Sequence, residues 1–375
     1  MTSERSLFLH LIRAVCAFLV CLNHAKEFIL IDRQSSDNLV SLSLRVFLSL
    51  GSQSVLVFFF ISGFLVGGRE LQNLRFGTLN PSKYFFDRLT RLWLVIIPAL
   101  FITYICNYLT CERIGFYEYC IDSKSLNFQS MSPIESQGIK DLVVNLFFLQ
   151  SFLGPEWGSN GPLWSLSFEF WYYMVFYSFL ILLWKMHGRV LRWTYVAIAV
   201  LIIIGGFYLL NLRWLNLGLV WFVGALAGGY TKELTHFRIL SASRFLPHIV
   251  LIFAILIFPT MIFNKLMPNS LSLFPIMGAM FLGIYAMNPE RNVVIGPFRI
   301  IIGLSNISFS LYAIHFPLLA LLTAAVGSSQ GLPLNFFNWL LVVLFSLVCV
   351  FFSFLFALVT ELRLGKVRQF LRSQF

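Results

Sequence analysis

Long apolar segments constrain this chain more than any other feature of its sequence. No Asp, Glu, Lys, Arg or His occurs in 94–109, 193–212 or 340–360. A helix that crosses the hydrocarbon core of a membrane needs about 20 mostly apolar residues. Hydrophobic residues make up 58% of the 375-residue chain and charged residues 11%, whereas a soluble domain is about half apolar and about a quarter charged. The sequence therefore predicts an all-α integral membrane protein built as a polytopic helical bundle.

The first apolar segment begins near the N-terminus but lacks the pattern of a cleaved signal peptide. It carries Arg13, His24, Lys26 and Glu27 and lacks a small-residue cleavage site. We therefore expect it to be retained as the first span. The net charge of +11 agrees with the tendency of Lys and Arg to gather in cytoplasmic loops. Because no basic patch is interleaved with soluble structure, the expected surroundings are membrane lipids, and nucleic acid is not an expected partner.

The apolar segments predict the membrane topology. They lie at 7–31, 44–67, 89–108, 142–153, 163–184, 193–211, 214–230, 246–263, 272–287, 300–326 and 338–360. Segment 142–153 would give only about 18 Å of helix against a hydrocarbon core of about 30 Å. If it re-enters the side from which it came, the loops rich in Lys and Arg fall in the cytoplasm. We therefore expect about ten full spans plus one re-entrant segment, both termini cytoplasmic, and a cavity near 142–162 that opens to the outside.

The sequence shows no linker and no repeat, so residues 1–375 are expected to form a single membrane domain without a fused soluble domain. Its six cysteines divide by position. Four lie in apolar spans and are expected to pack as small hydrophobic residues: Cys16, Cys21, Cys106 and Cys349. Cys111 and Cys120 flank a polar loop, where either a disulfide or two free thiols would fit.

Arg13 and His24 are the first ionisable pair within a predicted span. Eleven helical residues turn through roughly 20° more than three full turns, so the two side chains share one face about 16 Å apart. Ionisable residues inside spans are functional candidates. A snorkelling arginine and a histidine bonded to a backbone carbonyl would also explain them.

Glu169 lies about six residues into a span that starts outside, at a depth similar to that of His24. A carboxylate and an imidazole can orient each other, so we expect Glu169 to support His24. A structural carboxylate capped by backbone or arginine is the alternative. Ser165, Ser167 and Trp164 precede Glu169 and are candidates for substrate contact, although serines in spans more often bond between helices.

His315 lies closer to mid-membrane in a span whose first half is polar, and either substrate contact or helix packing would account for it. Arg88 and Arg91 are three residues apart at the predicted cytoplasmic mouth of the third span, on one side of the helix. Paired guanidinium groups suit phosphate because each presents a planar fork of donors. Ordinary positive-inside anchoring explains many such pairs as well.

Five segments together resemble membrane-bound acyltransferase family 3. They are, in the order of the family, LFLHLIRAVCAFLVCLNHAKEF, VFFFISGFLVG, FFDRLTRLWLVIIPAL, GPLWSLSFEFWYYMVFY and SNISFSLYAIHFPLL. The resemblance implies transfer of an acyl group, usually acetyl, from cytoplasmic acyl-CoA to a hydroxyl of a surface or exported glycan. Such an enzyme belongs in the bacterial cytoplasmic membrane.

The resemblance also assigns roles to residues. The matched positions are Arg13, His24, Arg88, Arg91 and Glu169. The arginines would bind acyl-CoA, and His24 would act as general base or carry the acyl group briefly, with Glu169 beside it in catalysis. Acetyl-CoA is the expected donor and a glycan or lipid-linked saccharide the expected acceptor, and no metal is expected.

Other polytopic proteins offer competing interpretations. A transporter or flippase would use His24, Glu169 and His315 as a proton relay. Such folds typically contain internal repeats, and none is visible here. A glycan polymerase would usually need a larger external loop, and a structural scaffold does not explain polar groups at matched depths. The acyltransferase interpretation is therefore preferred.

Overall fold

The computed structural model describes residues 2–30, 39–114, 136–185, 212–231, 292–327 and 335–374, with a few more within 277–284 and at 332–333. These residues are almost entirely helical. The only sheet among them pairs two-residue strands, β1 (Thr2–Ser3) and β2 (Asn292–Val293), in antiparallel fashion. Six helical stretches are long and apolar enough to cross a membrane. The prediction of a multi-pass helical membrane protein is therefore confirmed.

The candidate spans coincide with six of the predicted apolar segments. They are Glu4–Ile29, Gln53–Arg75, Pro81–Arg113, Gly161–Trp184, Ser308–Ala325 and Phe336–Ser373. The predicted segment 214–230 forms a shorter apolar helix, α9 (Leu212–Gly229). Segments 193–211 and 246–263 and most of 272–287 lie outside the described residues. The count of about ten crossings, the cytoplasmic termini and the single-domain organisation stay predictions.

The individual elements are, in chain order, α1 (Glu4–Ile29), α2 (Leu39–Ser62), the π-helix η1 (Gly63–Gly67), α3 (Gly68–Arg75), α4 (Pro81–Tyr108), η2 (Leu109–Arg113), α6 (Ile139–Leu146), η4 (Gly161–Leu163), α7 (Trp164–Lys185), α9, η7 (Gly296–Phe298), α13 (Arg299–Asn306), α14 (Ser308–Ala325), α15 (Phe336–Val359), η8 (Glu361–Arg363) and α16 (Leu364–Ser373). Cys111 is disulfide-bonded, whereas Cys120 lies outside the described residues. The other four cysteines are buried and free, as expected for small packing residues.

Segment 142–153, the predicted re-entrant element, does not form a span. Its helix α6 has 8 residues, which is about 12 Å and too short to cross a hydrocarbon core. The chain then turns at Phe148 and Ser151, whose φ angles are 57° and 65°. Asn145 holds this turn by donating from Nδ2 to the carbonyl oxygens of Asp141 and Pro155. The re-entrant path of this segment stays a prediction.

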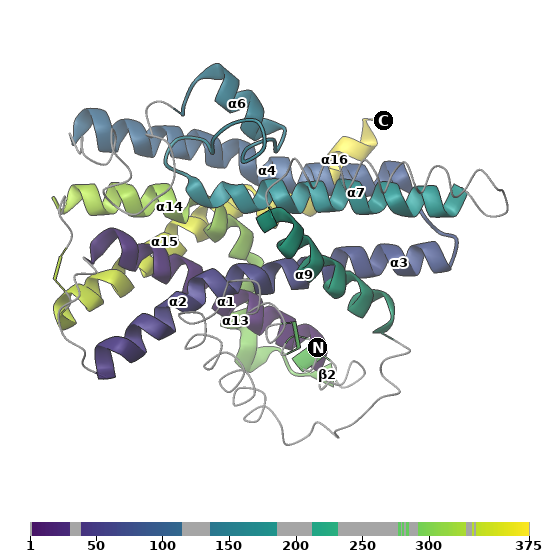
Figure 1. Ribbon diagram of the computed structural model, residues 1–375, viewed down its shortest axis with the longest axis horizontal. Coiled ribbons are helices and arrows are strands. Elements are labelled where there is room, and N and C mark those ends of the chain that lie inside the picture. The colour runs from purple at the N-terminus through teal and green to yellow at the C-terminus, as the bar shows by residue number, and fades with distance from the viewer. Residues whose placement is uncertain are drawn as a thin grey trace. The chain divides into compact units, whose positions relative to one another are not determined.

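Packing divides the chain into two compact units. The first comprises Met1–Leu9, Val55–Phe85 and Phe168–Phe298. In it, α9 crosses the junction between α2 and α3 (Figure 1) at a distance that only glycine permits. A Cβ on Gly63 would stand 1.9 Å from the carbonyl oxygen of Trp221, and one on Gly228 would stand 2.1 Å from that of Phe64. Small residues allow this close backbone approach between spans, where no water-driven hydrophobic effect holds helices together.

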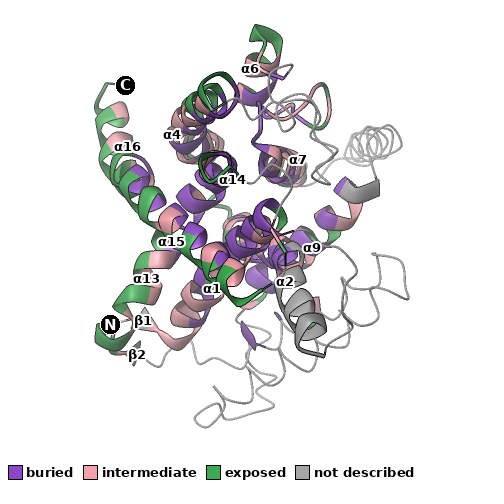
Figure 2. Ribbon diagram, turned by 90° about the vertical axis from the view of Figure 1, so that its left-hand side faces the viewer, coloured by how far each residue is buried: buried purple, intermediate pink, exposed green. Residues whose placement is uncertain are grey.

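The second unit comprises His10–Ser54, Phe86–Ser167 and Arg299–Phe375. Helices α14 and α15 run side by side in it (Figure 1). Of the six candidate spans, the one containing α14 is the most enclosed: 72% of its apolar stretch is buried, against 39% for Phe336–Ser373. Figure 2 shows α14 as largely buried. α14 is thus an interior helix, able to hold polar side chains away from lipid.

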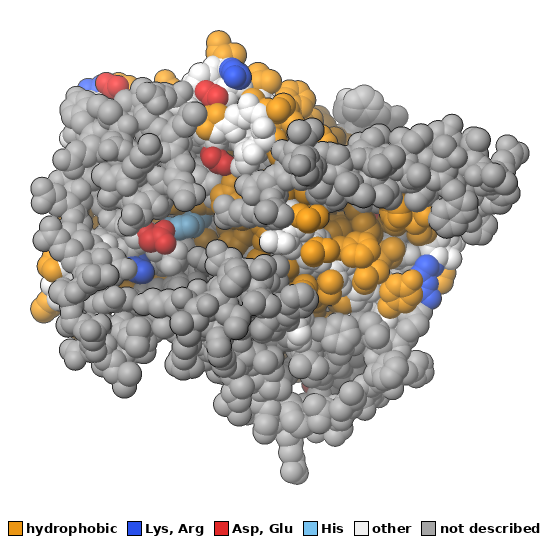
Figure 3. Space-filling model, in the orientation of Figure 1, with side chains coloured by type: hydrophobic (Ala, Val, Ile, Leu, Met, Phe, Trp, Pro, Cys, Tyr) orange, Lys and Arg blue, Asp and Glu red, His pale blue; other side chains and the backbone are white. Residues whose placement is uncertain are grey.

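Large apolar side chains are exposed on the helices that surround these interiors. On α15, Phe351 is 58% exposed and Val359 is 60% exposed. Figure 3 shows hydrophobic side chains gathered on the face that carries α9, where Leu219 and Phe222 are exposed. Exposed apolar surface of this extent is what a lipid-facing helix requires.

The glycine contact in the first unit yields a stability prediction. Gly228→Ala places a methyl group against the carbonyl of Phe64, so we expect overpacking that costs about 1–3 kcal/mol and a lower midpoint of thermal unfolding in detergent. Gly303→Ala is the matched control, because a Cβ at this helical glycine meets nothing within 4 Å. Equal unfolding midpoints for the two variants would contradict the close contact.

Candidate functional site

Two histidines meet in the interior of the second unit. The Nδ1 atom of His24, on α1, lies 2.8 Å from the Nε2 atom of His315, on α14. Phe316 packs edge-on against the His24 ring, with the ring centroids 5.1 Å apart. His315 is completely buried. Sequence reasoning named both histidines but did not pair them.

The carbonyl oxygens around His315 determine which nitrogen atoms carry protons. Its Nδ1 atom lies 3.0 Å from the carbonyl oxygen of Leu311 and 2.9 Å from that of Tyr312. A carbonyl oxygen only accepts, so Nδ1 carries the proton, and Nε2 of the neutral ring is an acceptor. His24 Nδ1 must then donate to it. This leaves the lone pair of His24 on its own Nε2 atom, the position that a general base requires.

A proline close to His315 links α14 to the loop before α7. Pro317 has no N–H group, so the carbonyl of Ala313, four residues earlier, lacks its usual helical donor. The Nδ2 group of Asn160 donates to this carbonyl over 2.8 Å and also to Thr103 Oγ1 over 3.0 Å. Leaving such a buried carbonyl without a donor would cost about 1–3 kcal/mol. Asn160 therefore fixes α14 near the histidine pair.

Arg13, like His24, contacts α14. Its Nη2 group donates to Ser308 Oγ over 3.0 Å, so both side chains of the predicted shared face of α1 contact α14. Glu361, directly after α15, accepts from the backbone N–H and the hydroxyl of Ser310 at 3.1 and 3.0 Å. This carboxylate also interacts electrostatically with Arg91 and Arg13. It was not foreseen from the sequence, where it is a single acidic residue after a long apolar run.

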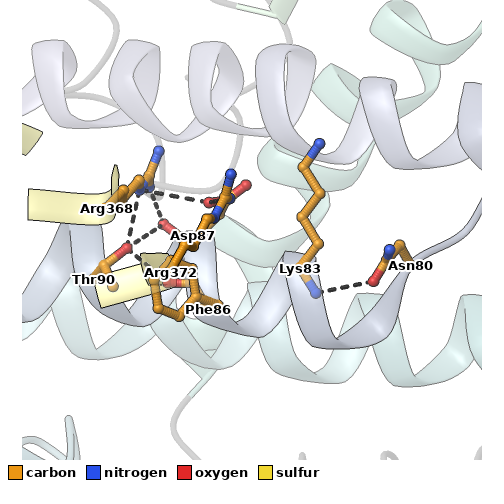
Figure 4. Close-up of polar contacts among 7 residues, drawn as sticks. All are labelled: Asn80, Lys83, Phe86, Asp87, Thr90, Arg368 and Arg372. Atoms are coloured by element: carbon orange, nitrogen blue, oxygen red, sulfur yellow. Dashed lines mark hydrogen bonds and ion pairs between the residues drawn. The ribbon is translucent and has the colours of Figure 1, made fainter. Parts of the chain in front are cut away.

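Arg88 and Arg91 lie near the start of α4, and α16 contacts their neighbours Asp87 and Thr90. Asp87 accepts from Arg372 Nη2 over 2.9 Å, and its backbone carbonyl accepts from Arg368 (Figure 4). Arg368 also donates from Nε to Thr90 Oγ1 over 3.0 Å. To the right in Figure 4, Asn80 directly precedes α4, accepts from the backbone N–H of Lys83 and caps the start of the helix.

Glu169 lies in the first unit, within a cluster of hydroxyl groups. Its Oε1 atom accepts from Ser62 Oγ over 2.5 Å and from the hydroxyl of Tyr173. Ser62 in turn accepts from Trp221 Nε1 over 3.2 Å. The serine of VFFFISGFLVG and the glutamate of GPLWSLSFEFWYYMVFY are thereby brought together. Nothing in the spacing of these two segments indicated that pairing, and support of His24 by Glu169 stays a prediction.

The two serines that precede Glu169 are bonded to protein groups. Ser165 Oγ lies 2.6 Å from the hydroxyl of Tyr312, and Ser167 Oγ donates to the carbonyl of Phe148 over 2.6 Å. Both are buried, and Trp164 is half-buried. Trp157 is buried and donates its indole N–H to the carbonyl of Leu100, which marks it as a packing residue. Substrate contact by Ser165, Ser167 and Trp164 stays a prediction.

A cluster of neutral polar groups surrounds the C-terminal end of α4. Gly158 has a φ angle of 56°, and a Cβ there would stand 2.2 Å from Asn107 Nδ2 and 2.6 Å from Gln137 Nε2. Buried polar atoms of Asn107, Gln137 and Ser159 have no hydrogen-bond partner among the residues that the structure describes. Buried polar groups are rarely left in this state, so the cluster is a candidate binding region.

Within the described ranges, no group of three or more His, Cys, Asp or Glu side chains could hold a metal ion.

The comparisons with known proteins give one match. A family model described as an acyltransferase domain matches residues 6–358, nearly the whole chain. Neither the curated proteins nor the solved structures gave a match.

The hydroxyl cluster around Glu169 yields a prediction. Glu169→Ala removes the acceptor that the hydroxyls of Ser62 and Tyr173 share. These hydroxyls lie 2.8 Å apart, so one can donate to the other and the second loses its acceptor, and we expect a loss of about 1–3 kcal/mol in unfolding free energy. Glu169→Gln keeps an acceptor oxygen at the same place and should lose clearly less. Thermal unfolding of both purified variants in detergent measures the difference. Equal losses would mean that acceptance by Oε1 is not what holds the cluster together.

Proposed function

Since the chain belongs to the acyltransferase family whose domain model it matches, we propose that it transfers an acyl group from acyl-CoA to a hydroxyl of a glycan or lipid-linked saccharide. Acetyl is the expected group, with acetyl-CoA as donor. The enzyme would lie in the bacterial cytoplasmic membrane, take its donor from the cytoplasm and act on an acceptor at the outer side.

The proposal is carried by the hydrogen bond between His24 and His315. Because His315 Nδ1 faces two carbonyl oxygens, the bond leaves His24 with an unprotonated Nε2 atom. The arrangement follows the logic of hydrolytic triads, in which a third group holds the base in its productive tautomer. His24 is the catalytic base in this proposal, and His315 is the positioning residue.

The chemical step moves one proton and one acyl group. His24 Nε2 takes the proton of the acceptor hydroxyl while the oxygen of that hydroxyl attacks the thioester carbonyl carbon. The carbon–sulfur bond then breaks, and the leaving thiolate takes the proton back from His24, so that CoA leaves as the free thiol. While His24 is charged, its Nδ1–H bond to His315 becomes charge-assisted and therefore stronger. General base catalysis of this kind contributes about 10²–10⁴-fold to rate.

A two-step route uses the same lone pair. His24 Nε2 would attack the thioester itself, CoA would leave as the thiolate, and His24 would carry the acyl group. The acceptor oxygen would then take the acyl group as its bond to Nε2 breaks, and the acceptor's proton would pass through Nε2 to the CoA thiolate. The two routes differ in a measurable way, because only the second produces acyl-labelled protein when radiolabelled acyl-CoA is supplied without acceptor.

The donor would be bound through its phosphates. Arg13, Arg88 and Arg91 supply guanidinium groups suited to bidentate phosphate contacts. Glu361 interacts with two of these arginines and would hold them in position before the donor arrives. A pantetheine arm could then extend from this region toward His24, about 16 Å further along α1.

The acceptor would be recognised by neutral groups. The amide and hydroxyl atoms of Asn107, Gln137 and Ser159 that lack a partner in the described part of the chain both donate and accept, which suits the many hydroxyls of a saccharide. Further contacts are proposed for the residues that follow Ser159 in the sequence, namely Trp164, Ser165 and Ser167.

One observation also favours a transporter, because hydrogen-bonded histidines can pass protons along a membrane protein. In such a relay, the proton on His315 Nδ1 would have to leave toward the carbonyl oxygens of Leu311 and Tyr312. Carbonyl oxygens accept hydrogen bonds but do not carry protons onward, so the path would end there. The same geometry serves a positioned base without this difficulty.

Substitution of the histidines tests the proposal. His24→Ala should abolish glycan acylation, because the base is lost while the protein still inserts. His315→Ala should lower kcat by about 10²-fold or more with KM for acyl-CoA little changed, since it only orients His24. Mass spectrometry of surface glycans from complemented cells measures the acylation, and steady-state kinetics with the identified acceptor separate kcat from KM.

His10→Ala is the matched control for these variants. This histidine lies on the same helix and contacts Ser305 Oγ at 2.9 Å, away from the histidine pair. It should retain acylation. Normal acylation in the His24→Ala variant would contradict the proposed mechanism, and identical glycan masses with and without the gene would favour transport.

A further inference from the structure

The C-terminal helix α16 is tied to the start of α4 by contacts that the proposed reaction has not used. Arg368 and Arg372 converge on Asp87 (Figure 4), with Nη2 of Arg372 at 2.9 Å and Nε of Arg368 at 3.5 Å from Oδ1. Arg372 also lies over the ring of Phe86, with 5.4 Å to the ring centre. The two segments are more than 270 residues apart in sequence, so this junction is a feature of the folded chain.

The junction concentrates positive charge. Arg368 interacts electrostatically with Arg88, Arg91 and Arg372, and Asp87 is the carboxylate that faces it. Adding Glu361, which interacts with Arg91 and Arg13, gives five guanidinium groups against two carboxylates among the described residues. Like charges held together at a partly buried site repel one another unless an anion joins them. The cluster is therefore built for an anionic ligand.

Exposure separates the roles of the two arginines. The Arg372 side chain is 51% exposed, whereas that of Arg368 is 23% exposed and interacts electrostatically with Arg88 and Arg91. A guanidinium carries five N–H donors, and the described hydrogen bonds of Arg368 use its Nε and Nη2 groups. Its Nη1 group retains donors for a ligand. Arg368 is thus the member of α16 best placed to share an anion with Arg88 and Arg91.

We propose that Arg368 joins Arg88 and Arg91 in a phosphate-binding cluster, so that α16 forms part of the donor site. The ligand chemistry is a phosphate ester or pyrophosphate, and we assign it to the phosphates of acyl-CoA. This inference rests on the proposed function. Anionic phospholipid headgroups share the same chemistry, but the half-hidden position of Arg368 against α4 favours a ligand that also reaches Arg88 and Arg91.

The experiment measures binding of CoA to the full-length protein in nanodiscs of phosphatidylcholine by isothermal titration calorimetry. Arg368→Gln should raise Kd for CoA about tenfold or more, as expected for loss of a hydrogen bond to a charged group. Lys366→Gln is the matched control, because it removes one exposed positive charge from the same helix. It should change Kd little. Arg368→Lys keeps the charge without the planar fork and should fall between the two.

A second ligand identifies the phosphate. If Arg368 contacts the 3′-phosphate, the Arg368→Gln penalty should disappear with 3′-dephospho-CoA. If it contacts the pyrophosphate, the penalty should be equal for both ligands. Either result supports the inference. Thermal unfolding checks that the variants are folded, and Arg368→Lys serves if Arg368→Gln does not fold.

Three results would overturn a proposal, and they can be told apart. Unchanged CoA affinity in Arg368→Gln, together with weakened affinity in Arg88→Gln or Arg91→Gln, would overturn only the inference about α16. If Arg368→Gln raised Kd for CoA in phosphatidylglycerol nanodiscs but not in phosphatidylcholine nanodiscs, the cluster would be assigned to lipid. Wild-type protein that does not bind CoA at all would overturn the proposed function itself.

Discussion

The hydrogen bond between His24 and His315 is the contact on which the proposed chemistry depends, and several features of α14 exist to define it. The carbonyls of Leu311 and Tyr312 fix the proton on His315. Pro317 leaves the carbonyl of Ala313 without a helical donor, and Asn160 donates a hydrogen bond to it. A polar ring inside a span costs free energy unless it is bonded and oriented. The interior position of α14 supplies both conditions, because its side chains are enclosed by protein and its backbone provides fixed acceptors.

The same requirement explains how the charged residues are arranged. Arg13 is bonded to a serine of α14, Glu361 to another, and Asp87 to two arginines of α16. Each contact joins segments far apart in the sequence, so neutralising a buried charge and assembling the helices are one event. Removing one partner would leave a partly buried charge uncompensated, which costs more than the pair contributes. The positive surplus that remains at α4 and α16 is what a phosphorylated donor would neutralise.

Sequence reasoning predicted the spans well and the site in part. The lengths of the apolar runs located six spans, and the angular spacing of Arg13 and His24 correctly predicted a shared face, since both contact α14. Depth along a span, however, does not give the lateral position of a side chain among the other helices. It could not pair His24 with His315, or Glu169 with Ser62 and Tyr173, because lateral position depends on how helices pack. The junction of Asp87 with α16 and the placement of Glu361 were equally invisible, since neither leaves a periodic signal.

The two ends of α4 carry different chemistry, and this difference restricts the reaction more than any single residue. Arg88 and Arg91 stand near its start, and Asn107 stands 16 residues after Arg91, which is about 24 Å along the helix. Charged donors at one end suit phosphates, whereas neutral amides at the other suit saccharide hydroxyls. A ligand bound at only one end would use only one of these two sets of groups. In the proposed reaction, donor and acceptor would therefore approach from opposite ends, and the donor would carry its acyl group on an extended arm to reach His24. Acyl-CoA meets that requirement because its thioester lies at the far end of a long chain from its phosphates.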